Sequence, residues 1–395
     1  MNRQAVFRLL HNQDVSVLII GAGINGVGLY RDLALQGVDV LLVDKADFCA
    51  GASAASTRII HGGLRYLENA EFRLVKEALL ERNRLLKNAA HYVRPLPTTI
   101  PIFRWTGGEW NAIRTFLRRP GKPSGRGALI IKAGLTMYDA FAGWGHAMPR
   151  HHFTSRGKAL EERPKLNPYI VSTATYYDAR ISYPERLCLE LILDAEAESP
   201  TVKALNYVGV RGAGDGAVSL VDELTGETVT VKPKLVVNAT GAWIDFTNHA
   251  LQRATQFIGG TKGSHLVLDN PELWAACRGE MMYFEYGAGR ILIFYPFFDK
   301  VIAGTTDIPV ENPDTAVCSE DEVDYILASV RQVFPEISVD RSQIVYRFCG
   351  VRPLPRSNAA TPGQISRGPC TPGAAVRCTR GRCAHARCAA MKQNS

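Results

Sequence analysis

A chain of 395 residues, 46% of them apolar, can bury a large core and is expected to form more than one domain. It has no run of eighteen apolar residues and no signal-peptide core at its start, so we expect it to be cytosolic or to lie on a membrane surface. Of the 46 Lys and Arg residues, ten lie in 341–395, which contains no acid, whereas residues 1–340 hold 36 basic and 38 acidic residues. The net charge of +8 therefore gives no support for a nucleic-acid-binding body.

Residues 15–44 predict a β-α-β unit. A near-continuous apolar run, Val15–Ile20, suits a strand that is buried on both faces. A helical segment and a second apolar run, Val38–Val43, follow. Between the first strand and the helix stand three glycines in the spacing G-x-G-x-x-G, Gly21, Gly23 and Gly26. This combination is the fingerprint of a dinucleotide-binding turn.

Each element of the fingerprint has a physical role. Gly21 allows the tight turn, Gly23 lets a pyrophosphate approach the backbone, and Gly26 lets the helix pack closely on the strand. The helix N-terminus offers N–H groups and a positive dipole end to the phosphates. Asp44, at the end of the second strand, is placed to accept hydrogen bonds from ribose hydroxyls. The motif alone does not separate NAD from FAD.

The segment after Asp44 is rich in small and hydroxylated residues, among them Ser53, Ser56 and Thr57, which can wrap closely around a pyrophosphate or a flavin. A sharp bend follows at His61, Gly62 and Gly63. One interpretation is that this segment lines a cofactor and presents Arg65 to an anion. The other is a flexible polar loop that leads into a helix.

Further along the chain, apolar spacing predicts helices over Glu71–Asn88, Glu185–Ser199 and Glu320–Val333. The segment from Arg94 to Trp105 is broken by prolines and reads as extended. Residues 104–132 are basic with interleaved aromatic side chains, which suits either contact with anionic lipid or a solvated linker.

Strands are predicted in two later regions. The first comprises alternating runs at 202–210, 218–223 and 228–231, followed by a buried strand at 235–238 that enters the small-residue turn Ala239, Thr240 and Gly241. The second, 262–309, contains longer runs typical of an antiparallel sheet. Residues 344–354 are predicted to form a last strand that returns to the first domain.

Seven motifs follow one another along the chain: G-A-G-I-N-G-x-G at 21–28, I-H-G-G-L-R-Y-L-E at 60–68, M-Y-D at 137–139, V-N-A-T-G-x-W at 237–243, K-G-S-H at 262–265, G-T-T-D at 304–307 and G-V-R-P-L at 350–354. In this order they resemble the FAD-dependent, quinone-linked glycerol-3-phosphate dehydrogenases over about residues 14–366. Several motifs in a shared order are far more specific than any one of them.

The resemblance implies an α/β fold in which a Rossmann-type FAD-binding domain carries an inserted α+β substrate domain built on an antiparallel sheet, as in glutathione reductase and D-amino-acid oxidase. The expected division begins with a first FAD-binding segment at 14–95, a helical and basic insertion at 96–165 and a second FAD-binding segment at 166–245. The substrate domain at 246–349, a return to the FAD domain at 350–366 and a disordered tail at 367–395 complete it.

The function that the resemblance implies is oxidation of glycerol 3-phosphate to dihydroxyacetone phosphate, with hydride transfer from C2 to FAD N5 and electrons passed to membrane quinone. It also implies a cytoplasmic location at the inner surface of the cytoplasmic membrane, no nucleic-acid partner, and leaves a homodimer open. Candidate catalytic residues, each within a family motif, are His61, Arg65, Lys262, His265 and Arg352. Arginine forks suit phosphate oxygens, and either histidine is a candidate base.

The chain departs from the family after about residue 366, because it lacks the expected G-G-K-x-T-T-x-R segment and helical C-terminal domain. We interpret residues 367–395 as out-of-frame or unrelated sequence joined to a truncated enzyme, with weaker flavin retention and substrate binding as the expected result. A zinc site at Cys378, Cys383, His385 and Cys388 is the rival interpretation of the tail, but its spacing does not match paired C-x-x-C ligands, so no metal site is predicted.

Three other functions stay open. A related FAD oxidase of a glycerophosphate or an amino acid would produce peroxide. A non-catalytic fragment would fail to retain flavin. An NAD-linked dehydrogenase would account for residues 1–44 but not for the N-A-T-G and H-G-G-L-R-Y motifs.

Overall fold

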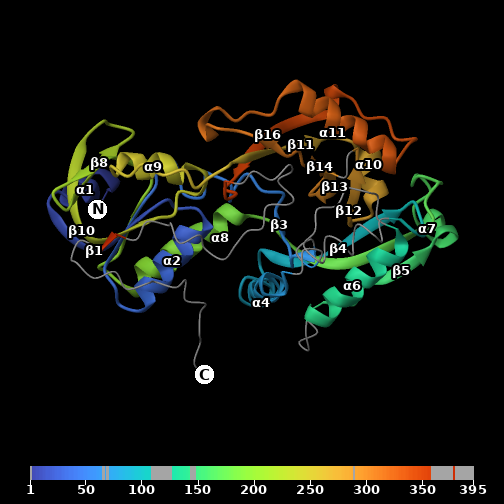
Figure 1. The fold of residues 1–395 in the computed structure, drawn as a ribbon, viewed down its shortest axis with the longest axis horizontal. Coiled ribbons are helices and arrows are strands. Elements are labelled where there is room, and N and C mark those ends of the chain that lie inside the picture. The colour runs from blue at the N-terminus through green and yellow to red at the C-terminus, as the bar shows by residue number, and fades with distance from the viewer. Residues whose placement is uncertain are drawn as a thin grey trace.

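The computed structural model describes residues 2–64, Leu67, 71–107, 127–142, 148–287 and 290–356, and the backbone of 377–378. Two sheets organise these residues, each with helices packed on it (Figure 1). The first sheet has the order β7-β2-β1-β10-β9-β8. Its strands are β1 (Gln13–Ile20), β2 (Val40–Val43), β7 (Lys203–Leu205), β8 (Val208–Gly214), β9 (Ala217–Asp222), β10 (Thr228–Asn238) and β17 (Arg377–Cys378), which pairs with β10.

Strands β7, β2, β1 and β10 run parallel, and β9 and β8 continue the sheet antiparallel. The predicted β-α-β unit is confirmed as β1, α2 (Ile24–Leu35) and β2. Val17 and Ile19 of β1 pack toward α2 and α8 (Pro184–Glu198), while Leu18 and Ile20 pack toward α1 (Arg3–Leu9). Because alternate residues enter different clusters, the strand is apolar on both faces, as its sequence indicates.

The second sheet has the order β15-β11-β14-β13-β12-β4-β6-β3, with β16 paired to β11 and β5 to β6. Its strands are β3 (Ile59–Ile60), β4 (Val93–Ile102), β5 (His152–Ser155), β6 (Ser172–Ile181), β11 (Thr261–Leu268), β12 (Met281–Tyr286), β13 (Arg290–Phe297), β14 (Lys300–Gly304), β15 (Ile308–Pro309) and β16 (Ile344–Arg352). Apart from the parallel pair β12 and β4, its pairs are antiparallel, which confirms the expected character of residues 262–309.

Helices cover both faces of the second sheet (Figure 1). On one side, called here the α11 face, lie α10 (Pro271–Cys277) and α11 (Glu320–Val333), packed on residues such as Leu266, Phe284 and Phe294. On the opposite face, α4 (Phe72–Asn88) and α6 (Ala128–Ala142) cover part of β4 and β6. The other α-helices in the described part of the chain are α7 (Arg156–Glu162) and α9 (Ile244–Ala250). None of the helices in the described ranges is long and apolar enough to cross a membrane.

Sheet membership differs from the expected division of the chain. Strands β4 and β6 both pair in the second sheet, although residues 96–165 were expected to be a helical insertion and 166–245 a segment of the FAD-binding domain. Strand β16 pairs along β11, so residues 344–352 also belong to the second sheet rather than to the first. The reason is that strand pairing joins residues far apart in sequence, which local patterns do not encode. The domain boundaries themselves stay a prediction.

The tail is described at two residues, Arg377 and Cys378, which pair with Val236 and Leu235 of β10. The rest of 357–395, including Cys383, His385 and Cys388, lies outside the described residues, and the disordered tail at 367–395 stays a prediction. Most of the basic segment 104–132 lies outside them as well.

Candidate active site

The glycine-rich turn is held by backbone contacts that exclude side chains at two of its three glycines. Gly21 has a φ of +105°, and a Cβ on it would lie 2.6 Å from the carbonyl oxygen of Ala239. A Cβ on Gly26 would lie 1.9 Å from the carbonyl oxygen of Gly21. The turn after β1 thus rests directly on the segment after β10. The structure brings together the two segments that the sequence assigned to one cofactor.

Asp44 and Ser53 complete this turn. The Asp44 carboxylate accepts hydrogen bonds from the amides of Ala22 (2.7 Å) and Ala46 (2.9 Å). Burial raises the pKa of Asp44, and these two amides oppose the rise. Ser53 Oγ accepts a hydrogen bond from the Ile24 amide at 3.0 Å. The loop that follows β2 is therefore attached to the first turn of α2.

The residues present fit a dinucleotide. Gly23 is the N-cap residue of α2, and no side chain caps it. A Cβ on Gly23 would meet Ser53 Oγ at 3.4 Å, an ordinary contact, so packing within the protein does not require a glycine here, and the close backbone approach that a glycine allows suits a pyrophosphate. The N-terminal end of a 12-residue helix with its positive dipole suits a pyrophosphate. Asp44, directly after β2, would then hold the ribose hydroxyls.

The loop after β2 also contacts the second sheet. A Cβ on Gly350 of β16 would lie 2.7 Å from the carbonyl oxygen of Ala55, so the loop touches this strand two residues before Arg352. Further along, Ile59 pairs with Arg180, and Ile60 with Ala179, as β3 joins β6. The loop therefore connects the cofactor turn to both ends of the second sheet.

Arg352 is held on the face of the second sheet opposite α11. It pairs with Thr261 across β11, so it shares that face with Gly263 and His265. Its guanidinium donates to Thr305 Oγ1 at 2.9 Å and to Asp307 Oδ1 at 3.2 Å. A guanidinium fixed in this way can present its fork of N–H donors to an anion in a defined orientation.

The structure places Lys262 on the other side of the sheet. Its Nζ donates to Glu322 Oε2 at 2.7 Å and to the Val317 carbonyl at 2.6 Å, both on the α11 face. Glu322 also accepts from Thr306 Oγ1 at 2.6 Å. Because neighbouring strand residues point to opposite faces, Lys262 does not share a face with Arg352, although the sequence grouped the two as substrate partners.

His265 lies inside the protein rather than at an open site. Its side chain is 3% exposed and stacks on Phe348, and neither ring nitrogen has a hydrogen-bond partner among the described residues. Burial, together with the charge of Arg352, lowers the pKa of His265 to about 3. Such an imidazole stays neutral and is a weak base at neutral pH.

His61 is the more accessible histidine, with half of its side chain exposed. Its Nδ1 lies 3.1 Å from Oδ2 of Asp178, a carboxylate that is 1% exposed. The Gly62 amide donates to Oδ1 of the same carboxylate at 2.9 Å. Two neighbouring residues of the predicted site, His61 and Gly62, thus contact one buried carboxylate that no sequence pattern indicated.

Asp178 has two further partners, Arg82 and Tyr138, and neither is among the predicted site residues. Tyr138 donates to Oδ1 at 2.8 Å, and Arg82 Nη1 lies 3.3 Å from the same oxygen. One signal was present in the sequence, because Arg82 continues the apolar stripe of α4 after Val75 and Leu79. A charge on such a stripe indicates a buried partner.

The remaining predicted residues are placed as follows. Ser56 Oγ accepts from the Arg58 amide, Gly63 has a φ of +88°, and Gly241 begins a short 3-10 helix with a φ of +60°. Thr240 donates from both its amide and its hydroxyl to Asn238 Oδ1. Thr57 lies in the same loop as Ser56, half-buried. Arg65 lies outside the described residues.

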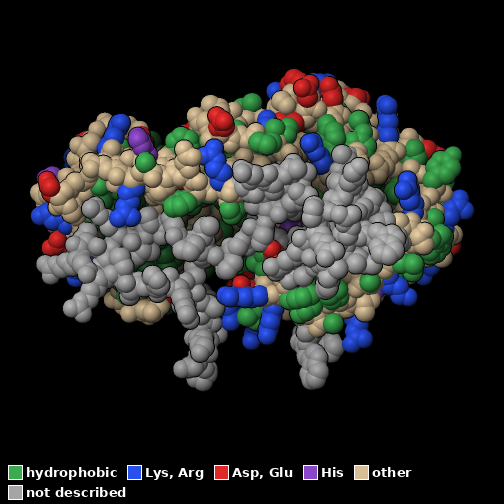
Figure 2. All heavy atoms as spheres, in the orientation of Figure 1, with side chains coloured by type: hydrophobic (Ala, Val, Ile, Leu, Met, Phe, Trp, Pro, Cys, Tyr) green, Lys and Arg blue, Asp and Glu red, His purple; other side chains and the backbone are tan. Residues whose placement is uncertain are grey.

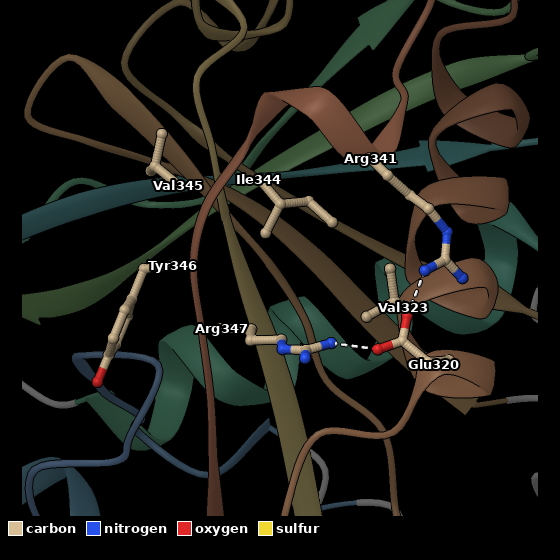
Figure 3. Close-up of a pocket in the computed structure, with 7 residues that line it drawn as sticks. All are labelled: Glu320, Val323, Arg341, Ile344, Val345, Tyr346 and Arg347. Carbon is tan, nitrogen blue, oxygen red and sulfur yellow. Dashed lines mark hydrogen bonds and ion pairs between the residues drawn. The ribbon is translucent and has the colours of Figure 1, made fainter.

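A separate depression of about 490 Å³ lies between the start of α11 and the first residues of β16 (Figure 3). Glu320 pairs there with both Arg341 and Arg347. None of the predicted site residues lines it. In the space-filling view, acidic side chains gather over α11, while Lys and Arg side chains occur at several separate places on the described surface (Figure 2). The depression is therefore lined in part by ion-paired surface residues and is separate from the predicted site.

Comparison with known proteins decides the family. A family model described as DAO, FAD dependent oxidoreductase, matches residues 16–375. The chain belongs to this family. The match begins within β1 and extends beyond β16, and it makes FAD the cofactor, a choice that the glycine motif alone left open. Among the described residues, no group of three or more His, Cys, Asp or Glu side chains is arranged to hold a metal ion.

Relatives of this FAD-dependent oxidoreductase act on phosphorylated substrates by name. This chain is 35% identical over 380 residues to the glycerol-3-phosphate dehydrogenase of Synechocystis sp., and the match covers 91% of this chain and 64% of that protein. It is 28% identical to the alpha-glycerophosphate oxidase of Streptococcus pneumoniae, with a match that covers 91% of this chain and 57% of that protein. The chain thus spans less than two thirds of these relatives. The solved glycerol-3-phosphate dehydrogenase of Bacillus halodurans, complexed with FAD, shares the fold, with a TM-score of 0.67, 24% identity, and coverage of 90% and 60%.

Proposed function

We propose that this chain oxidises glycerol 3-phosphate to dihydroxyacetone phosphate. The reaction removes a hydride from C2 of the substrate and a proton from its C2 hydroxyl. FAD, when bound, supplies the oxidant that accepts the hydride. Gly23, Asp44 and Ser53 of this chain would hold the cofactor. The tasks left to the other residues are to bind the phosphate, orient C2 and accept the proton.

His61 is the proposed proton acceptor. Its ring is half exposed and its Nδ1 is engaged by Asp178, which leaves Nε2 as the atom that can take the hydroxyl proton. His265 is the weaker candidate, since its ring nitrogens are buried and its pKa is lowered to about 3. The observation that carries the proposal is the contact between the His61 imidazole and the Asp178 carboxylate. It occurs in a chain that is 35% identical to a glycerol-3-phosphate dehydrogenase.

Arg352 is the proposed phosphate partner, together with Arg65 of the same set of motifs. Thr305 and Asp307 orient the guanidinium of Arg352. Gly350, two residues earlier on β16, contacts the loop after β2. A fork of fixed donors suits the phosphate oxygens of a small dianion. Lys262 is proposed to support the sheet through Glu322 rather than to contact the substrate directly.

The test is the visible spectrum of the purified chain with FAD, recorded before and after anaerobic addition of glycerol 3-phosphate. We expect a flavin spectrum that bleaches with glycerol 3-phosphate and not with glycerol. His61→Gln should retain the flavin and bleach at least about 100-fold more slowly, because a positioned base contributes that much. A flavin that never bleaches, or no flavin at all, would contradict the proposal and favour a non-catalytic fragment.

The electron acceptor is a separate element of the proposal. We propose membrane quinone, on the resemblance of the chain's motifs to quinone-linked enzymes. Oxygen is the second candidate, favoured by the similarity to an oxidase of the same substrate. Stopped-flow reoxidation of the substrate-reduced chain distinguishes them. Fast reoxidation by a soluble quinone with little peroxide supports quinone, and stoichiometric peroxide in air supports oxygen.

We also propose that the chain works at the cytoplasmic face of the cytoplasmic membrane, as a peripheral protein, and that it forms a homodimer there. The basic, aromatic residues 104–132 support contact with anionic lipid. Flotation with anionic vesicles, compared with neutral ones, tests the contact, and sedimentation tests the dimer. Equal recovery with both vesicle types would contradict the lipid contact, and a monomer at all concentrations would contradict the dimer.

A further inference from the structure

The strongest unassigned feature of the molecule is the buried carboxylate of Asp178. It lies on β6, 117 residues after His61 in sequence, with 1% of its surface exposed. Four donors surround it, from the β3 end of the sheet, from α4 and from α6. A buried carboxylate costs free energy unless donors and opposite charge compensate it, so this number of partners indicates a group kept in its ionised form.

The two oxygens of the carboxylate have different partners. Oδ1 accepts hydrogen bonds from the Gly62 amide at 2.9 Å, from the Tyr138 hydroxyl at 2.8 Å and from Arg82 Nη1 at 3.3 Å. Oδ2 lies 3.1 Å from Nδ1 of the His61 ring. Three donors on one oxygen fix the orientation of the carboxylate. The second oxygen is thereby aimed at the imidazole.

The charge of the group decides the direction of the hydrogen bond. Burial alone would raise the pKa of Asp178, but His61, the Gly62 amide and Arg82 together hold it below the ordinary value for a carboxyl group. Asp178 is therefore ionised at neutral pH and can only accept. Nδ1 of His61 must then carry a hydrogen, and in the neutral imidazole the lone pair lies on Nε2.

We propose that Asp178 is the positioning residue of the catalytic base. It holds His61 in the Nδ1–H tautomer, turns Nε2 away from the buried network, and stabilises the imidazolium that forms when Nε2 accepts the substrate's hydroxyl proton. This inference rests on the proposed function, in which His61 is the base. The logic is that of a base oriented by a third group, which an acid residue commonly provides.

The surroundings explain why the arrangement is rigid. A Cβ on Gly62 would lie 1.9 Å from Tyr138 OH and 2.5 Å from Leu79, so the chain after His61 passes directly against α6 and α4. Arg82 is 2% exposed and donates to Tyr138 OH at 2.8 Å and to the Tyr177 carbonyl at 3.1 Å. The guanidinium of Arg82 thus balances the negative charge of Asp178 and also fixes Tyr138, another donor to the same carboxylate.

Histidine nitrogen NMR tests the inference directly. The chain has nine histidines, and His61→Gln assigns the His61 signals. With selective 15N-histidine labelling, at a pH where imidazole is neutral, we expect the wild-type chain to show a protonated Nδ1 and an unprotonated Nε2 at His61. Asp178→Asn should change this to mixed tautomers. A wild-type His61 with its proton on Nε2 overturns the inference without any variant.

Kinetics supply the second measurement. Asp178→Asn should lower kcat for glycerol 3-phosphate by at least about 100-fold, with KM within about threefold and with flavin retained, because the base is misoriented while binding is kept. In a His61→Gln background, the same change should have little further effect. An unchanged kcat, or equal losses in both backgrounds, would mean that Asp178 has a structural role alone.

Two controls separate positioning from stability. Tyr138→Phe removes one donor to Oδ1 but leaves the contact between Oδ2 and His61, so it should keep the tautomer even if it lowers stability. Glu190→Gln breaks the surface contact with His91 and should change neither readout. If the wild-type chain does not oxidise glycerol 3-phosphate, the proposed function fails, and the tautomer measurement still decides the role of Asp178.

Discussion

At the scale of single residues, the glycines of the first turn are distinguished by what surrounds them. A Cβ on Gly26 meets the carbonyl oxygen of Gly21, whereas a Cβ on Gly28, two residues further along α2, meets nothing within 4 Å. The two positions therefore have the same residue for different reasons. Gly26 is required by a close approach of helix and strand, and Gly28 is not.

This contrast gives a prediction on stability. Gly26→Ala should lower the free energy of unfolding by about 1–3 kcal/mol or more, because the turn must move to admit the methyl group. Gly28→Ala should raise it by about 0.5–1 kcal/mol, through the better helix propensity of alanine. Urea unfolding of the two variants measures both values. Equal effects of the two substitutions would contradict the packing described for α2.

Glu322 gives a prediction on pH. Burial alone would raise its pKa, but Lys262 and the hydroxyls around it lower the pKa to about 2, against an ordinary value of 4.5. A carboxyl with a depressed pKa stabilises the fold above pH 4.5 and loses that contribution as the pH falls from about 4.5 toward about 2. The difference in unfolding free energy between the wild type and Glu322→Gln should therefore shrink across this range. A difference that does not vary with pH would count against the ion pair.

At the scale of elements, α4 links the second sheet to the segment that carries His61. Its buried stripe includes Val75, Leu79 and Arg82, while Leu80 faces outward and is 49% exposed. Leu79 lies against Gly62, and Arg82 reaches Asp178. The helix therefore supports the fold and the candidate base through the same face.

Two neighbouring leucines of α4 test this. Leu79→Ala should lower the free energy of unfolding by about 2–5 kcal/mol, since it leaves a cavity under Gly62. Leu80→Ala removes the same atoms from the exposed face and should cost no more than about 0.5 kcal/mol. Chemical unfolding of both variants provides the comparison. Similar losses in the two would mean that α4 does not pack as described.

At the scale of the whole molecule, the cofactor turn touches both sheets. The loop after β2 accepts a hydrogen bond from the Ile24 amide of α2 through Ser53, contacts β16 at Gly350, and continues into β3. A ligand on this turn therefore contacts a loop whose position depends on both halves of the described chain. Its binding is expected to stabilise the molecule as a unit.

Thermal unfolding with added cofactor measures this coupling. FAD at about 100 times its dissociation constant should stabilise the native chain by about 2.7 kcal/mol and raise Tm accordingly. NAD is the matched control, because the glycine motif by itself fits either dinucleotide. A rise of Tm with NAD and none with FAD would contradict the assignment of the turn.

Local patterns in the amino-acid sequence are enough to predict those elements of the protein that neighbouring residues specify. The glycine spacing and the apolar runs around it predicted β1, α2 and β2, and 3.6-residue periodicity predicted α4 and α11 within a residue of their observed ends. Motif order indicated the FAD-dependent family. These features are local because backbone conformation and amphipathic periodicity are properties of neighbouring residues.

Which residues come into contact follows instead from the pairing of the strands in the folded chain. It paired β6 with β3 and β4, which set Asp178 beside His61, and it put Lys262 and Arg352 on opposite faces of one sheet. The physical reason is that strand pairing and register join distant segments, and a shift of one residue reverses every side chain. Residue types alone suggested the candidate site residues, and the register of β11 and β6 decided which of them lie on the same face of the sheet.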